Sequence, residues 1–112
     1  MKEQVDNLTQ LIESLPTFSL TSGYSELNSI LYKFTGILNY FNSYNEDYRR
    51  ATNVYYADLS TIRQDIQESL YAKSYNDKVS AFEAAKKDLR SNMLALIMLA
   101  KPAQVSVEPM MA

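Results

Sequence analysis

Hydrophobic side chains recur at helical spacing through most of this chain of 112 residues. Near its start, intervals of 3, 4 and 3 residues separate the apolar side chains Val5, Leu8, Ile12 and Leu15. An α-helix turns once in about 3.6 residues, so this spacing places all four on one face. Pro16 disfavours helical geometry in the residue before it. The pattern therefore predicts a short helix over residues 2–15.

A longer hydrophobic pattern begins after a loop that ends near Ser22, a suitable N-cap residue. Intervals alternating between 4 and 3 separate Ile30, Phe34, Ile37, Phe41, Tyr44, Tyr48, Ala51 and Tyr55. This is a heptad repeat, which is typical of helices that pack along a shared seam. After a four-residue stutter, the seam continues at Leu59, Ile62, Ile66 and Leu70. The pattern predicts a helix over residues 24–73.

The middle of that segment also carries a signal for a helix start. Ser43 followed by Glu46 matches a capping box, which indicates a kink within residues 42–46. The hydrophobic phase does not jump there, however, and an unbroken phase favours a continuous helix. The sequence leaves both alternatives open.

The hydrophobic phase does jump within residues 72–78. The apolar residues after this point project nearly opposite to the face centred on Ile62 and Ile66. A tight reversal with Ser74 as N-cap and Asp77 in a capping box removes the conflict. One unbroken helix with different partners on its two sides is the alternative. We favour the reversal, with a final helix over residues 75–100.

The last helix ends in eight consecutive apolar residues, MLALIMLA, and Pro102 is expected to stop it. Residues 101–112 contain two prolines and alternate weakly at Val105 and Val107, which predicts an extended arm. Such an arm can add a strand to a neighbouring chain or fill a groove on it. The predicted fold class is all-α: a short N-terminal helix, a long helix folded back as a coiled-coil-like hairpin, and an extended C-terminal arm. Residues 1–100 form a single helical domain.

Composition argues against most kinds of catalytic site. The chain has no Cys and no His, which removes thiolate chemistry, the commonest general base and the commonest transition-metal ligand. Its two glycines form no phosphate-binding loop. Asp58, Asp65 and Glu68 lie along one flank of the long helix without a convergent partner. We predict a protein that is not an enzyme and that needs no cofactor or metal.

Charge and hydropathy give weaker indications about other partners. The formal net charge of −2 disfavours extensive nucleic-acid binding, although Lys86, Lys87 and Arg90 form a candidate basic contact. The start MKEQVDNLTQ does not fit a secretory signal, and no apolar run reaches the length of a membrane span. These features favour a location inside a cell or inside a particle.

Tyrosine is concentrated in residues 40–56, with five of the nine tyrosines of the chain. Tyrosine and Met are enriched at protein interfaces. The candidate interface residues are Tyr40, Tyr44, Tyr48, Tyr55, Tyr56, Met93, Ile97, Val105, Val107, Met110 and Met111.

The length of the seam determines the functional expectation. A continuous helix over residues 24–73 is about 75 Å long, more than the other two helices can cover. The surplus predicts a structural or assembly protein that packs into a homo-oligomer or a larger multi-protein particle. Virus and phage particles contain many such small helical proteins, an association without a motif behind it. The alternatives are a small helical adaptor that binds one partner protein and a nucleic-acid-binding accessory protein.

Overall fold

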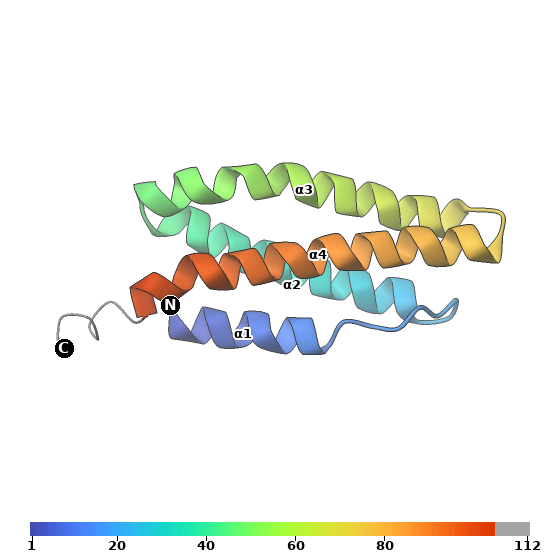
Figure 1. Cartoon of the computed structure of the whole chain (residues 1–112), viewed down its shortest axis with the longest axis horizontal. Helices are drawn as coiled ribbons and strands as arrows, with labels where there is room; N and C mark the ends of the chain where they lie inside the picture. Colours follow the sequence, from blue (N-terminus) through green and yellow to red (C-terminus); the bar gives the residue numbers. More distant parts are fainter. Residues whose placement is uncertain (105–112) are drawn as a thin grey trace.

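Four helices account for nearly all of the part of the chain that the structure, a computed structural model, describes, residues 1–104. The helices are α1 (Lys2–Glu13), α2 (Gly23–Tyr44), α3 (Glu46–Tyr71) and α4 (Tyr75–Gln104). They lie side by side and alternate in direction (Figure 1). Each packs against its neighbours in chain order, and α1 also packs against α4. The all-α class is confirmed, and within residues 1–104 the architecture is an up-and-down four-helix bundle.

The long helix expected over residues 24–73 is two helices, so the continuous alternative is wrong. Asn45 has an extended backbone with φ −159° and ψ 178°, and the chain reverses direction there. The N-cap of α3 is Asn45 and not Ser43, because the Asn45 Oδ1 accepts a hydrogen bond from the Tyr48 backbone N–H at 2.9 Å. The bundle measures 57 × 24 × 18 Å, shorter than the rod that one helix would have formed.

The heptad seam is folded onto itself across this turn. Its α2 members Ile30, Phe34, Ile37 and Phe41 and its α3 members Leu59, Ile62 and Ile66 are all buried. Tyr44 and Leu70 are 53% and 46% exposed, so their predicted core positions are wrong. The inward stripe of α3 instead includes Thr52 and Ser69, whose exposure is 0%. With these two polar residues the α3 spacing is regular and needs no stutter.

The predicted reversal after α3 is confirmed. The Ser74 Oγ accepts a hydrogen bond from the Asp77 N–H at 3.1 Å, as expected of an N-cap. The Lys78 Nζ donates to the carbonyl oxygens of Leu70 at 2.7 Å and Ser69 at 3.3 Å. A cation at these carbonyls satisfies acceptors that the end of α3 leaves free. The turn is therefore held from both sides.

Helix α4 continues beyond its predicted end at residue 100. It reaches Gln104, so residues 101–104 are helical and not part of an extended arm. Pro102 has no backbone N–H, so the helix loses one hydrogen bond, the one to the carbonyl of Met98. Met98 is 64% exposed, so this part of the helix is open to water. Of the apolar run, Met93, Leu96 and Ala100 are buried. The arm residues Val105, Val107, Met110 and Met111 lie outside the described residues.

Helix α1 completes the bundle by packing against α4 and α2. Its buried residues are Leu8 and Leu11, the second of which the hydrophobic spacing did not single out. At the opposite end from the α2–α3 turn, the ring of Phe18 makes edge-on contacts with Tyr24 and Phe82, with centroids 6.0 and 5.2 Å apart. The loop before α2 is thereby anchored to α4.

The expected surplus of apolar seam does not exist within residues 1–104. Apart from the exposed Tyr44 and Leu70, most of the seam side chains that were expected to need another chain are covered inside the bundle of the same chain. The surface left for another protein is the outer side of the helices.

Candidate protein-binding face

The exposed side of α2 carries very little charge. Of the 22 residues of α2, only Glu26 and Lys33 are charged. At 100° per residue, the small residues Ser29, Gly36 and Ser43 lie within about 40° of one another along the middle of this side. Tyr32 and Tyr40 flank them and are 81% and 40% exposed. An uncharged surface of Tyr, Ser, Asn and Gly loses little solvation energy when another protein covers it.

A cleft of about 550 Å³ runs along the border between α1 and α2. Helix α1 lines it with three amide side chains, one hydroxyl and one apolar side chain: Gln4, Asn7, Gln10, Ser14 and Leu11. Helix α2 lines it with Lys33, Gly36, Ile37 and Tyr40. The amides can both donate and accept hydrogen bonds. The cleft has an apolar floor, a polar rim and a single cation.

Gly36 leaves open space in this cleft. A Cβ atom built on Gly36 has no described atom within 4 Å beyond its own helix. Packing inside the chain therefore does not require glycine here, although glycine weakens a helix interior by about 0.5–1 kcal/mol relative to alanine. At Gly23 the equivalent Cβ meets the Phe82 ring at 3.5 Å, so that glycine is covered from within.

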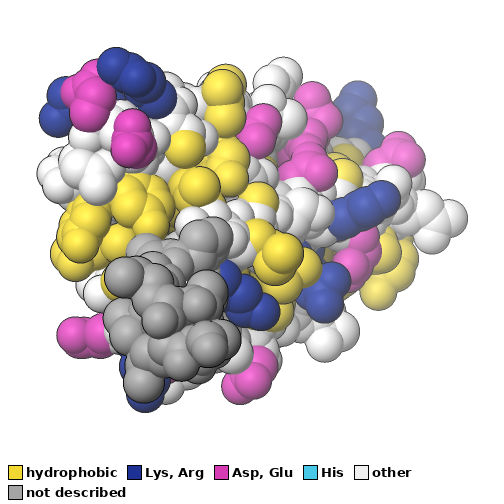
Figure 2. Space-filling model, turned by 60° about the vertical axis from the view of Figure 1, so that its left-hand side comes forward, with side chains coloured by type: hydrophobic (Ala, Val, Ile, Leu, Met, Phe, Trp, Pro, Cys, Tyr) yellow, Lys and Arg dark blue, Asp and Glu magenta, His cyan; other side chains and the backbone are white. Residues whose placement is uncertain are grey.

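An aromatic cluster lies where α2 meets α3. The rings of Tyr40 and Tyr44 have centroids 6.0 Å apart, and Tyr48 lies 5.4 Å from Tyr44 and 5.6 Å from Phe41. Figure 2 turns this end of the bundle forward and shows hydrophobic side chains exposed beside a group of acidic and basic ones. Three of the five predicted tyrosines thus form one continuous surface beside the cleft.

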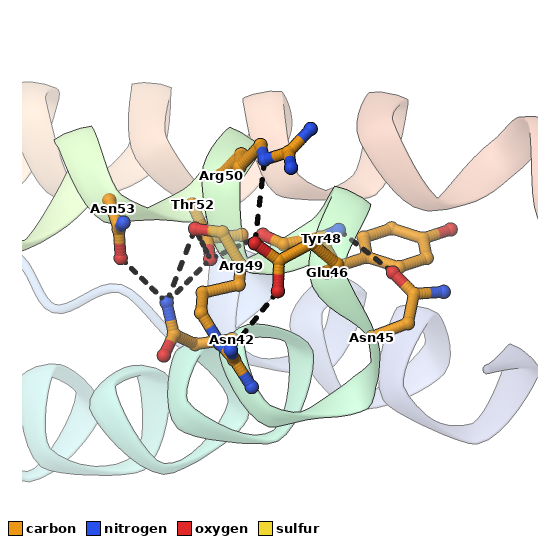
Figure 3. Close-up of polar contacts among 8 residues, drawn as sticks. All are labelled: Asn42, Asn45, Glu46, Tyr48, Arg49, Arg50, Thr52 and Asn53. Atoms are coloured by element: carbon orange, nitrogen blue, oxygen red, sulfur yellow. Dashed lines mark hydrogen bonds and ion pairs between the residues drawn. The ribbon is translucent and has the colours of Figure 1, made fainter.

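Hydrogen bonds fix the orientation of this cluster (Figure 3). The Asn42 Nδ2 of α2 lies 3.1 Å from the Thr52 Oγ1 and 3.0 Å from the Asn53 Oδ1 of α3. The buried Thr52 hydroxyl donates to the Tyr48 carbonyl at 2.7 Å. Exposed Glu46 forms ion pairs with Arg49 and Arg50 at 3.1 and 3.5 Å. Both sides of the α2–α3 turn are therefore held together.

Three tyrosine hydroxyls of α3 have altered acidity. Burial raises the pKa of Tyr48 above its ordinary value of 10.0, and nearby Tyr44 adds to the shift. Burial also raises the pKa of Tyr55, with a contribution from the Asp58 carboxylate, and the pKa of Tyr56. The Tyr56 hydroxyl donates to the Asn39 Oδ1 at 2.6 Å. These hydroxyls remain neutral at physiological pH and act as hydrogen-bonding groups.

Other predicted interface residues are not on this face. Met93 has an exposure of 0% and belongs to the core, so its assignment to an interface is wrong. Ile97 is half-buried and packs against the core. Tyr55 and Tyr56 are half-buried on α3. The exposed apolar residues of that stretch of α4 are Leu94 and Met98.

The three residues of the candidate nucleic-acid contact lie within about one turn of α4. Lys86 Nζ lies 3.9 Å from a Glu83 carboxylate oxygen, while Lys87 and Arg90 are exposed. A small hollow between α3 and α4 contains Asp58 and Asp88 among its lining residues. Burial raises the pKa of nearby Asp65, with contributions from Glu68 and Asp88. This region is thus mixed in charge, which gives phosphate groups no uniform positive surface.

The described part of the chain shows neither a metal-binding cluster nor a membrane-spanning helix. Within residues 1–104, no three acidic side chains come together in a way that can hold a metal ion. None of the helices described there is both long and apolar enough to cross a membrane.

Apart from Tyr40 and Tyr44, the residues of the face on α1 and α2 were missed, because hydrophobic periodicity reports the buried side of a helix. The scarcity of charge across residues 23–44 is visible in the sequence and was the available signal. The cleft itself has no such signal, since it depends on how α1 packs against α2.

Comparisons with protein-family models, curated proteins and solved structures give no match.

Proposed function

We propose that this chain is a non-enzymatic assembly protein that binds another protein chain through the outer face of α2. We call this surface the α2 face: Ser29, Tyr32, Lys33, Gly36, Tyr40, Ser43 and Tyr44, with the α1 wall of the cleft. The observation that carries the proposal is the near absence of charge on an exposed helix that presents tyrosines around an open glycine. Protein interfaces are depleted of charge at their centre and enriched in tyrosine.

The rigidity of the bundle supports this use of the surface. Tyr40 and Tyr44 stand on a helix that is pinned to α3 by Asn42. Aromatic side chains held in place lose little conformational freedom on binding, so more of their contact energy contributes to affinity. The heptad seam itself is not available to a partner, because it is covered inside the bundle.

The C-terminal arm forms a second part of the proposal. Residues 105–112 read VSVEPMMA, with apolar side chains at Val105, Val107, Met110 and Met111. We propose that this segment contacts a neighbouring chain in the assembly. The composition supports it, since Val favours added strands and Met adapts to irregular pockets.

Site-specific photo-crosslinking in the cells that contain this protein tests the α2 face. A photoreactive amino acid replaces Tyr32 or Tyr40 in separate variants, and Val54, 65% exposed on α3, serves as the matched control. We expect a discrete crosslinked product from the two α2 positions and none from position 54. Products of equal yield from all three positions, or from none, contradict the proposal.

A further inference from the structure

We infer that the α2 face binds the α2 face of a second copy of this chain, with the two α2 helices antiparallel and crossing at Gly36. This inference rests on the proposed function and names its partner. Three observations carry it: the position of Gly36, the distribution of charge around it, and the area that the face offers.

Gly36 lies in the middle of the cleft. The α2 residues that line the cleft run from Lys33 to Tyr40, and Gly36 stands between them with open space above its Cα. Two helices approach most closely where side chains are small, and Ser29 and Ser43 extend the small surface by two turns on each side. A two-fold axis at Gly36 therefore brings cleft onto cleft, with the smallest side chains of the face at the crossing.

Charge selects the antiparallel arrangement. Of the described residues that line the cleft, Lys33 alone is charged. With the crossing at Gly36, Lys33 of one copy faces residues 39 and 40 of the other, so its ammonium group can stack on the exposed ring of Tyr40. The two-fold axis makes this contact twice. A parallel two-fold pair would instead turn the two clefts to opposite sides of the contact, so that Lys33 of one copy would not face Tyr40 of the other.

The rest of α2 adds no charge that opposes this arrangement. Glu26, its one acidic residue, lies ten residues before Gly36 and does not line the cleft. A partner with a strongly charged surface finds no comparable match on this face, which favours a second copy over such a protein.

The exposed tyrosines supply about a third to a half of the area that a standard interface buries on each partner. Tyr32, Tyr40 and Tyr44 are 81%, 40% and 53% exposed. At about 150–250 Å² for a fully buried aromatic side chain, they contribute roughly 250–450 Å² together. A standard interface buries about 800 Å² on each partner. The amide-lined α1 wall and the serines of α2 supply the remainder.

The absence of cysteine from the chain makes a direct crosslinking test simple. The purified variants Gly36→Cys and Val54→Cys each carry one thiol, and both positions have room for the side chain. With a short bis-maleimide, we expect Gly36→Cys to form a covalent product of twice the 12.8 kDa chain mass. We expect Val54→Cys to stay monomeric. Equal crosslinking of both variants, or none at position 36, overturns the inference.

Sedimentation equilibrium on the unmodified chain gives an independent measurement. We expect a monomer–dimer equilibrium, and we expect Gly36→Leu to raise the dimer dissociation constant by about tenfold or more, as changes at the centre of an interface do. Val54→Leu should leave it unchanged. Circular dichroism of both variants checks that they keep the helical fold. A wild-type chain that remains monomeric at all concentrations overturns the inference.

The two proposals can fail separately. If the photoreactive α2 positions crosslink only to a different protein while the purified chain stays monomeric, the second-copy inference is wrong and the proposed function stands. If those positions give no specific product and the purified chain is also monomeric, both are wrong.

Discussion

Helices α2 and α3 are antiparallel neighbours of similar length that bury similar seams, yet their outer sides differ. Helix α2 carries two charged residues among 22. Helix α3 carries eight among 26, namely Glu46, Asp47, Arg49, Arg50, Asp58, Arg63, Asp65 and Glu68. About a quarter of the residues in an average soluble protein are charged, so α3 is ordinary and α2 is unusual.

The comparison separates two roles of a helix surface. Burial on the inner side stabilises the bundle in both helices and produces the same heptad spacing. The outer side of α3 is typical of a surface that stays in water. The outer side of α2 lacks the charges that keep a surface solvated, and stability of the isolated chain gives no reason for that.

The largest effect should separate the two sides of α2. Phe34→Ala removes a fully buried ring and should lower the free energy of unfolding by about 3–5 kcal/mol. Tyr32→Ala, only two residues away but 81% exposed, should change it by less than about 0.5 kcal/mol. Urea denaturation followed by circular dichroism measures both. A loss above 1 kcal/mol for Tyr32→Ala would show that the outer tyrosine supports the fold.

The turn between the two helices should show an intermediate effect. Asn45→Ala removes the side-chain acceptor for the Tyr48 N–H and should destabilise the bundle by about 1 kcal/mol. Exposed Ser43 was the cap expected from the sequence, and Ser43→Ala should be nearly neutral. Thermal denaturation of the two variants compares them. If Ser43→Ala destabilised the bundle more than Asn45→Ala, the N-cap of α3 would be Ser43 and not Asn45.

Substitution of Gly36 should stabilise the isolated chain. Gly36→Ala places a methyl group in open space and reduces the freedom of the unfolded chain, so the monomer should gain about 0.5–1 kcal/mol. Gly23→Ala is the comparison: its Cβ makes ordinary van der Waals contacts with Phe82 and the Thr17 carbonyl at 3.5 Å, so the methyl group also fits. It should gain less because Gly23 is the first residue of α2, where helix propensity counts for less than in the interior. Urea denaturation at low protein concentration measures both. A destabilised Gly36→Ala monomer would show that glycine is needed within the fold.

The smallest effect concerns pH. Burial raises the pKa of Tyr48 above 10.0, so above pH 10 the folded chain holds this proton more tightly than the unfolded chain. The contribution of the neutral Tyr48 hydroxyl to the free energy of unfolding is therefore fully present below pH 10, and it should be lost as pH rises through the raised pKa. Tyr48→Phe removes the titrating group and should make this decline shallower in denaturation curves between pH 9 and 11. An unchanged slope would mean that the Tyr48 hydroxyl is solvated in the folded state.

The helical periods by themselves determined the fold class, the first helix, the turn at Ser74 and the inward faces of α2 and α3. They did so because burial of apolar side chains is periodic in a helix, and the period can be read locally. Ile30, Phe34, Ile62 and Ile66 were placed in the core on this basis and are buried.

The packing of the helices, and not the hydrophobic pattern, sets the reversal at Asn45 and the cleft that α1 and α2 leave around Gly36. The hydrophobic phase runs unbroken from Phe41 to Tyr48, and the extended backbone of Asn45 reverses the chain with both helices still facing the common core. Phase continuity therefore did not distinguish a continuous helix from a reversal. The space above Gly36 likewise depends on which side chains α1 brings beside it, and that is set by packing between segments far apart in the sequence.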